Sequence, residues 1–138
     1  MNYRQYFIEL GNLAYAISLA NGKIYKEESD VFYKMIKSHL KPLKESCDEQ
    51  GVDNEFLTEF IFNTLKENEV GLEPALDSYM DFVDKNKNII TENLKRVTIE
   101  IIEEVAGAYN GIEDSDIEDI EFLNKPKLRK IRHQGGFF

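Results

Sequence analysis

Apolar residues recur along most of the chain at intervals of three and four positions, and no strand-like alternation of apolar and polar residues lasts more than a few positions. Such intervals place side chains on one face of an α-helix. They are clearest towards the C-terminus, at Ile90, Leu94, Val97, Ile101, Val105 and Ala108. The pattern predicts an all-α fold, and the short connections between apolar segments predict that consecutive helices lie roughly antiparallel.

Two helices are expected before residue 50. The first covers residues 6–20 and ends at Asn21-Gly22, because Gly adopts the left-handed conformation after a helix without steric cost. The second begins at the acidic residues of 27–30, which suit the positive end of a helix dipole. Lys41-Pro42 is expected to interrupt or kink it.

The third and fourth helices follow a polar link at residues 47–53. Asp53 or Asn54 is expected to cap the third helix, whose expected inward face carries Phe56, Leu57, Phe60, Ile61, Thr64 and Leu65. The fourth helix is expected to turn inward Leu72, Leu76, Tyr79, Met80 and Val83. A loop at residues 85–88 then leads to the fifth helix.

A second turn, Asn110-Gly111, lies 89 residues after Asn21-Gly22 and is expected to end the fifth helix before a short sixth one that stops by Pro126. Five apolar positions before the two turns also match, since residues 99, 102, 105, 106 and 109 repeat residues 10, 13, 16, 17 and 20. We interpret this as a duplicated helical hairpin. The expected architecture is a compact bundle of about six to seven helices with pseudo-two-fold symmetry.

The residues around the first turn resemble the tellurite-resistance TerB-like family, whose hallmark is an apolar helix ending in Ala-Asp-Gly-x-Ile, repeated near the C-terminus. The matching stretches are Leu13-Ala14-Tyr15-Ala16-Ile17, Ala20-Asn21-Gly22-Lys23-Ile24 and Glu27-Glu28. The strong match covers residues 8–40, and residues 99–123 match weakly. The resemblance implies an all-helical, non-catalytic binding or adaptor module in stress responses. Asn21 and Asn110 replace the family's Asp, which weakens any role of that Asp as a ligand or charge partner.

Composition predicts one domain, residues 1–124, followed by a basic tail, residues 125–138. A single cysteine, Cys47, excludes an intrachain disulfide and fits a reducing compartment. No apolar run reaches the roughly 18 residues that a membrane span needs, so we expect a cytoplasmic protein without a transmembrane segment. Residues 1–124 hold all 26 acidic residues and 12 of the 17 basic ones, a net charge of −14. This charge argues against a nucleic-acid partner.

The expected binding surface is the groove between the two Asn-Gly hairpins, because loops displayed on a rigid scaffold commonly bind ligands. Its candidate residues are Asn21, Lys23, Glu27, Asn110, Glu113 and Asp114. The partner is expected to be a protein of unknown identity, bound by a monomer or a homodimer.

A divalent-cation site is the alternative, because six carboxylates lie within residues 113–121 and hard cations such as Ca²⁺ or Mg²⁺ bind carboxylate oxygens. Its candidate ligands are Glu113, Asp114 and Asp116. A regular EF-hand is excluded at the first turn, since the first two ligand positions would be Ile17 and Leu19. Otherwise, no cofactor is expected.

Catalytic chemistry has no recognisable motif in this chain. The Gly-x-Ser-x-Gly and Gly-x-x-x-x-Gly-Lys patterns are missing, and neither histidine has a Glu three positions before it, as di-iron bundles require. We therefore do not expect an enzyme. His39 lies on an apolar face and is expected to be a half-buried structural residue.

The basic tail, residues 125–138, holds five Lys and Arg, no acidic residue and a terminal Phe137-Phe138. Three roles stay open for it. It could pack on the acidic body, serve as a docking peptide for a partner with both phenylalanines as anchors, or contact an anionic membrane surface or nucleic acid.

Overall fold

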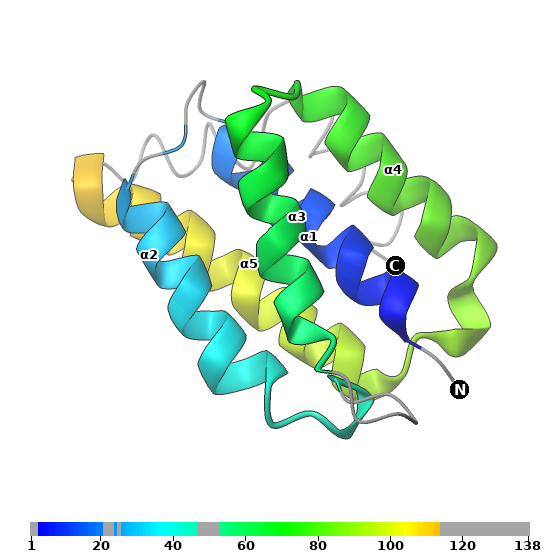
Figure 1. The fold of residues 1–138 in the computed structure, drawn as a ribbon. Coiled ribbons are helices and arrows are strands. Elements are labelled where there is room, and N and C mark those ends of the chain that lie inside the picture. Colours follow the sequence, from blue (N-terminus) through cyan, green and yellow to red (C-terminus); the bar gives the residue numbers. More distant parts are fainter. Residues whose placement is uncertain (1–2, 21–23, 25, 47–52, 114–138) are drawn as a thin grey trace.

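The structure of this chain is a computed structural model that describes residues 3–20, 24, 26–46 and 53–113, with the backbone alone for residues 27, 28 and 106–113. Within these ranges there are five α-helices and no strand (Figure 1), so the predicted all-α class is confirmed. The α-helices are α1 (Arg4–Leu19), α2 (Lys26–Met35), α3 (Glu55–Glu67), α4 (Leu72–Lys85) and α5 (Glu92–Glu113). Three single turns join them, namely the π-helical η1 (Ile36–Leu40) and the 3-10 turns η2 (Lys44–Ser46) and η3 (Lys87–Ile89).

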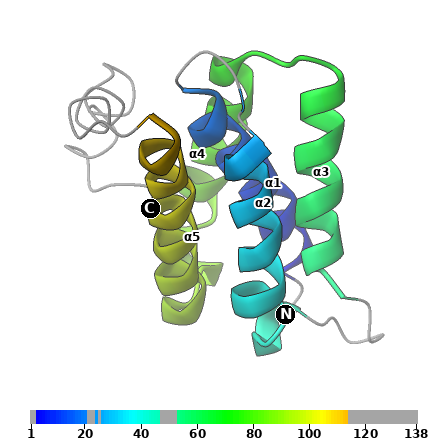
Figure 2. The same cartoon turned by 90° about the vertical axis from the view of Figure 1, so that its left-hand side faces the viewer.

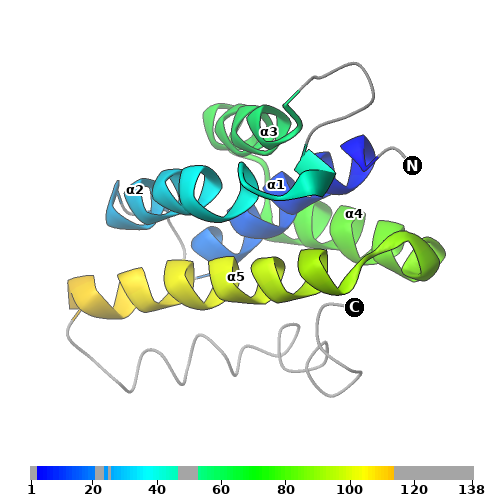
Figure 3. The same cartoon turned by 90° about the horizontal axis from the view of Figure 1, so that it is seen from below.

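Helix α1 lies at the centre of the bundle. In the view from below, α3 covers it on one side, α5 on the other, and α2 and α4 flank it (Figure 3). Eleven of its 16 residues are buried, including Ala14, Tyr15, Ala16, Ile17 and Ser18 in succession. A helix that is buried on every side needs small or apolar residues all round, and the predicted core positions Leu10, Leu13 and Ile17 are confirmed.

Helices α1 and α3 approach each other closely at Gly11. A Cβ atom built on Gly11 would lie 2.7 Å from the carbonyl oxygen of Thr58 and 2.9 Å from Cβ of Ile61. The Thr58 hydroxyl donates to the Phe7 carbonyl oxygen at 2.6 Å. Gly11 therefore allows the two backbones to meet, and Thr58 ties them together.

The predicted inward face of α3 is wrong at Phe56 and Phe60, whereas Leu65 packs against the core as predicted. Phe56 and Phe60 are 64% and 55% exposed, whereas Thr58 and Phe62 are fully buried. The contact of Thr58 with α1 sets the rotation of the helix, and the Phe62 ring packs 4.4 Å from that of Phe32 on α2. With residues 58 and 62 facing inward, the helical period turns residues 56 and 60 away from the core.

The structure shows in more detail how three of the predicted helices begin or end. Asn54 precedes α3 as predicted, but its side chain makes no capping hydrogen bond. The second helix changes at Ile36 into a π-turn, closed by the Lys41 amide donating to the Ile36 carbonyl at 3.0 Å, and this helical run ends at Leu40, so the interruption predicted at Lys41-Pro42 is confirmed. The predicted loop at residues 85–88 includes the start of η3.

Helix α5 does not end at Asn110-Gly111 as predicted but continues to Glu113. A glycine inside a helix costs only about 1 kcal/mol relative to alanine, so the pair weakens a helix without necessarily stopping it. The first turn, Asn21-Gly22, and the short sixth helix lie outside the described residues. Consequently, neither the duplication nor the count of six to seven helices is confirmed.

Candidate functional site

The part of the predicted binding surface that the structure describes falls at one end of the molecule. Three of the surface's six residues lie outside the described residues, namely Asn21, Lys23 and Asp114. The other three lie on described backbone, in the first turn of α2 and the last turn of α5, namely Glu27, Asn110 and Glu113. Because α2 and α5 pack side by side and run antiparallel, α5 ends where α2 begins (Figures 1 and 2). The groove itself stays a prediction.

The nearest described hollow to this end has a volume of about 480 Å³ and lies where the end of α1 meets the connection between α3 and α4. Its floor is largely apolar, with Leu19, Ile24 and Val70, and Lys66 and Glu69 stand at its rim. The Tyr15 hydroxyl, which donates to the Val70 carbonyl oxygen at 2.5 Å, fixes one wall. Burial, followed by the negative charge of Glu69, raises the pKa of this tyrosine.

The predicted cation ligands, Glu113, Asp114 and Asp116, have no described side chains. Among the side chains that are described, no group of three or more His, Cys, Asp or Glu residues is arranged to hold a metal ion. The cation site thus stays a prediction.

The aspartates of α4 and His39 make surface and structural contacts. Asp77, Asp81 and Asp84 are exposed along α4, and the last two pair with Lys85 at 3.0 Å and Lys87 at 3.8 Å. His39 is half-buried as predicted, and its Nδ1 lies 3.8 Å from Oε2 of Glu100, which links η1 to α5.

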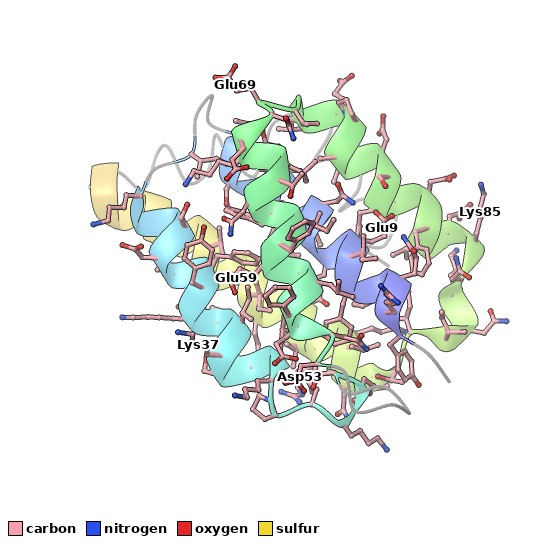
Figure 4. All side chains as sticks on the ribbon, viewed as in Figure 1. Glu9, Lys37, Asp53, Glu59, Glu69 and Lys85 are labelled. Atoms are coloured by element: carbon pink, nitrogen blue, oxygen red, sulfur yellow. The ribbon has the colours of Figure 1, made fainter. Side chains whose placement is uncertain are left out.

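A buried carboxylate, Glu9, bridges α1 and α4 (Figure 4). The Ser78 hydroxyl lies 2.7 Å from its Oε1 and 3.0 Å from its Oε2, and the Asn12 and Gln5 amides donate at 3.0 and 3.3 Å. Neutral donors thus replace the water that a buried carboxylate loses. The arrangement holds two helices together and supplies no activated nucleophile, since Ser78 has no described histidine as a base.

A second group of buried polar side chains lies where η2 meets α3. Glu45, Asn54 and Glu55 are buried, and each has at least one side-chain atom without a hydrogen bond. Burial raises the pKa of Glu55, with a further contribution from the negative charge of Asp53, while its own backbone amide and Lys41 act in the opposite direction. No described nucleophile contacts this carboxyl group.

The most distinctive surface feature is an exposed aromatic pair on α3. Phe56 and Phe60 are the large apolar side chains most exposed among the described residues. They are four positions apart, so their rings occupy neighbouring turns on one side of the helix. Glu59 lies beside them on the same helix. We call Phe56, Glu59 and Phe60 the α3 outer face.

Two acidic residues, Glu59 and Asp30, act on the seam between α2 and α3 beside the α3 outer face. Glu59 lies between α2 and α3 (Figure 4), near Tyr33 of α2, whose hydroxyl donates to Oδ1 of Asn63 at 2.5 Å. Burial raises the pKa of Tyr33, and the charges of Glu59 and Asp30 raise it further. Both charges acting on this hydroxyl are negative, so the seam between α2 and α3 favours a cationic neighbour.

Sequence reasoning missed this face because it placed both rings in the core. One signal was available: α3 carries six apolar residues at positions 56, 57, 60, 61, 62 and 65, which surround more of the helix than one buried stripe occupies. At least one apolar side chain had to face outward.

Comparisons with known proteins leave the family open. No protein-family model matches the chain, and searches of curated proteins and of solved structures give no match. The resemblance to the TerB-like family therefore stays a prediction from residues 8–40. Within the described ranges, no helix combines the length and the apolar character that crossing a membrane requires.

Proposed function

We propose that this chain is a non-catalytic protein-interaction module that binds its partner through the α3 outer face. The exposure of Phe56 and Phe60 carries the proposal. Full burial of a phenylalanine side chain is worth about 1.5–3 kcal/mol, so two exposed rings on adjacent turns leave substantial stabilisation available to a partner. Exposed aromatic side chains that lie together are typical of interaction sites.

The charge around the rings selects the kind of partner. Glu59 lies within the α3 outer face, Asp30 acts on the neighbouring Tyr33, and the body as a whole is strongly acidic. An acidic segment would be repelled, while a basic one would be attracted over a distance of about 10 Å at ordinary salt concentrations. The proposed ligand is therefore a basic protein segment with aromatic or aliphatic side chains.

The resemblance of residues 13–28 to the TerB-like family supports the same class of function, because it implies an adaptor in stress responses. In this proposal the chain acts in the cytoplasm. The proposal keeps the six residues predicted around the two Asn-Gly pairs as a second contact surface, namely Asn21, Lys23, Glu27, Asn110, Glu113 and Asp114.

Titration of the isotopically labelled chain with three synthetic peptides tests the proposal. One peptide is basic with phenylalanines, one is basic without them, and one is acidic with them. We expect the first to bind best and to shift the backbone amide signals of residues 56–60 most. Phe56→Ser/Phe60→Ser should weaken its binding at least about tenfold, a difference of about 1.4 kcal/mol.

Asp81→Ser/Lys85→Ser is the matched control, because it removes two exposed side chains one turn apart on α4, and removing one acid and one base leaves the net charge unchanged. Binding by this variant should equal that of the unchanged chain. Equal binding of all three peptides, or amide shifts confined to other helices, would refute the α3 outer face as the binding surface.

A further inference from the structure

The basic tail of the chain has the chemistry that the α3 outer face is proposed to bind. Residues 125–138 contain Lys125, Lys127, Arg129, Lys130 and Arg132, no acidic residue, and the aromatic end Phe137-Phe138. The two phenylalanines of the tail could therefore pack against the two phenylalanines of α3. The basic residues of the tail carry the charge opposite to that of the acidic residues beside α3.

The length of the chain beyond α5 is sufficient for this contact within one molecule. Twenty-five residues follow Glu113, and a fully extended chain covers about 3.3–3.6 Å per residue, or about 85 Å in total. Helix α5, with 22 residues, is about 33 Å long at 1.5 Å per residue. A tethered segment of this length reaches any side of the bundle and is present at a high effective concentration.

We propose that residues 125–138 dock on the α3 outer face of the same molecule, with Phe137 and Phe138 against Phe56 and Phe60 and the bases beside Asp30 and Glu59. The docked tail occupies the surface that a partner needs, so it acts as a built-in competitor. This inference rests on the proposed function, because it assigns an internal ligand to the same face.

The absence of tryptophan from the chain provides a direct probe. In the full chain carrying Phe138→Trp, the indole is the only one, and its emission is expected to be shifted to the blue by contact with the α3 outer face. Adding Phe56→Ser/Phe60→Ser should return the emission to that of a tryptophan in water, while adding Asp81→Ser/Lys85→Ser should not. An emission typical of water in the first variant would overturn the proposal.

Charge and concentration give two further readouts. Asp30→Asn/Glu59→Gln should reduce the blue shift more than Asp81→Asn/Asp84→Asn, although each pair removes two negative charges, and added salt should reduce it as well. The shift should not change on dilution. A shift that disappears on dilution would mean that the tail docks on a second copy and would overturn docking within one molecule.

Competition separates this inference from the proposed function. A tail that is docked for four-fifths of the time lowers the apparent affinity for an external ligand about fivefold. The basic peptide with phenylalanines should therefore bind Phe137→Ser/Phe138→Ser about fivefold more tightly than the unchanged chain. Equal binding to both would overturn the docked tail but leave the proposed function intact. Binding to neither would contradict both.

Discussion

Gly11 shows how one residue without a side chain sets the packing of two helices. A Cβ there would meet the backbone oxygen of Thr58 at 2.7 Å, well inside van der Waals contact, and backbone cannot move aside as a flexible side chain does. By contrast, a Cβ on Gly71 would approach no atom more closely than 3.5 Å, and the backbone of Gly71 has φ −69° and ψ 159°, an extended conformation open to any residue.

We therefore expect Gly11→Ala to destabilise the protein and Gly71→Ala to leave its stability nearly unchanged. Alanine favours the helix at position 11 by about 1 kcal/mol, but overpacking of a close helix contact costs about 1–3 kcal/mol. Because the clash at position 11 is with backbone, we expect the upper part of that range and a net loss of up to about 2 kcal/mol. Urea unfolding monitored by circular dichroism measures both. A Gly11→Ala variant as stable as the unchanged chain would contradict this close contact.

Two buried tyrosines make the stability sensitive to alkaline pH. Tyr6 forms a 2.6 Å hydrogen bond with Thr98 and lies 3.4 Å from the Tyr79 hydroxyl. Burial raises the pKa of Tyr6 from 10.0 to about 12, despite the opposing hydrogen bonds from Thr98 and Tyr79. Burial likewise raises the pKa of Tyr79, and Tyr6 and Glu9 raise it further.

In the unfolded chain these tyrosines ionise at their ordinary pKa of about 10, whereas in the folded chain they ionise only at higher pH. We therefore expect their titration to leave the unfolding free energy unchanged below pH 10 and to lower it above pH 10. Tyr6 alone should contribute a loss of about 3 kcal/mol between pH 10 and pH 12, at about 1.4 kcal/mol per pKa unit. Urea midpoints across this range measure the decline. Tyr6→Phe should make the decline shallower, and an unchanged slope would show that Tyr6 does not titrate as described.

At the level of single residues, the sequence predicted side chains whose burial follows from helical periodicity, such as Leu10, Leu94 and Val97. Charged residues in buried places could not be predicted this way, because their partners come from distant segments. Glu9 depends on Ser78, which lies 69 positions away. The exposure of Phe56 was missed for the same reason, since the orientation of α3 is set by Thr58 and Gly11.

The start of α5 illustrates how one helix is fixed by another element. The Leu94 amide donates to the Thr91 hydroxyl oxygen at 3.1 Å, a helix-capping bond, and the same hydroxyl donates to Oε2 of Glu45 in η2 at 2.5 Å. Glu45 is only 3% exposed, and its other oxygen has no hydrogen bond. Thr91 therefore both caps α5 and satisfies a buried carboxylate.

Removing an ordinary helix cap lowers the unfolding free energy by about 1 kcal/mol. We expect Thr91→Ala to lower it by more, because this change also removes a hydrogen-bond partner of the buried Glu45 carboxylate. A loss of about 2–3 kcal/mol in thermal or urea unfolding should result. Thr91→Ser keeps the hydroxyl and should stay within about 0.5 kcal/mol of the unchanged chain. Equal losses in the two variants would show that the hydroxyl is not responsible.

At the level of elements, the sequence predicted the existence of α1 to α5 but not all of their ends. Helix α1 ends at Leu19 and α2 begins at Lys26, with Asn21-Gly22 between them outside the described residues, whereas Asn110-Gly111 lies inside α5. An Asn-Gly pair therefore does not by itself fix the end of a helix, as α5 shows. This is also why the site predicted from the two turns could not be assembled from the sequence alone.

For the whole molecule, the buried core accounts for stability, whereas the exposed aromatic pair on α3 does not. The bundle buries its core around α1, yet α3 leaves Phe56 and Phe60 in water. Neither ring contributes much to the core, so Phe56→Ser/Phe60→Ser should change the unfolding free energy by no more than about 0.5 kcal/mol per residue. A variant that folds as well as the unchanged chain but binds less would separate function from stability.

The most direct test of the α3 outer face is the dissociation constant of the basic, phenylalanine-containing peptide for three full-length chains measured side by side. These are the unchanged chain, Phe56→Ser/Phe60→Ser and Asp81→Ser/Lys85→Ser. We predict a dissociation constant at least about tenfold higher for the first variant and unchanged for the second. The same dissociation constant for all three chains would contradict the claim that this protein binds its partner through Phe56 and Phe60.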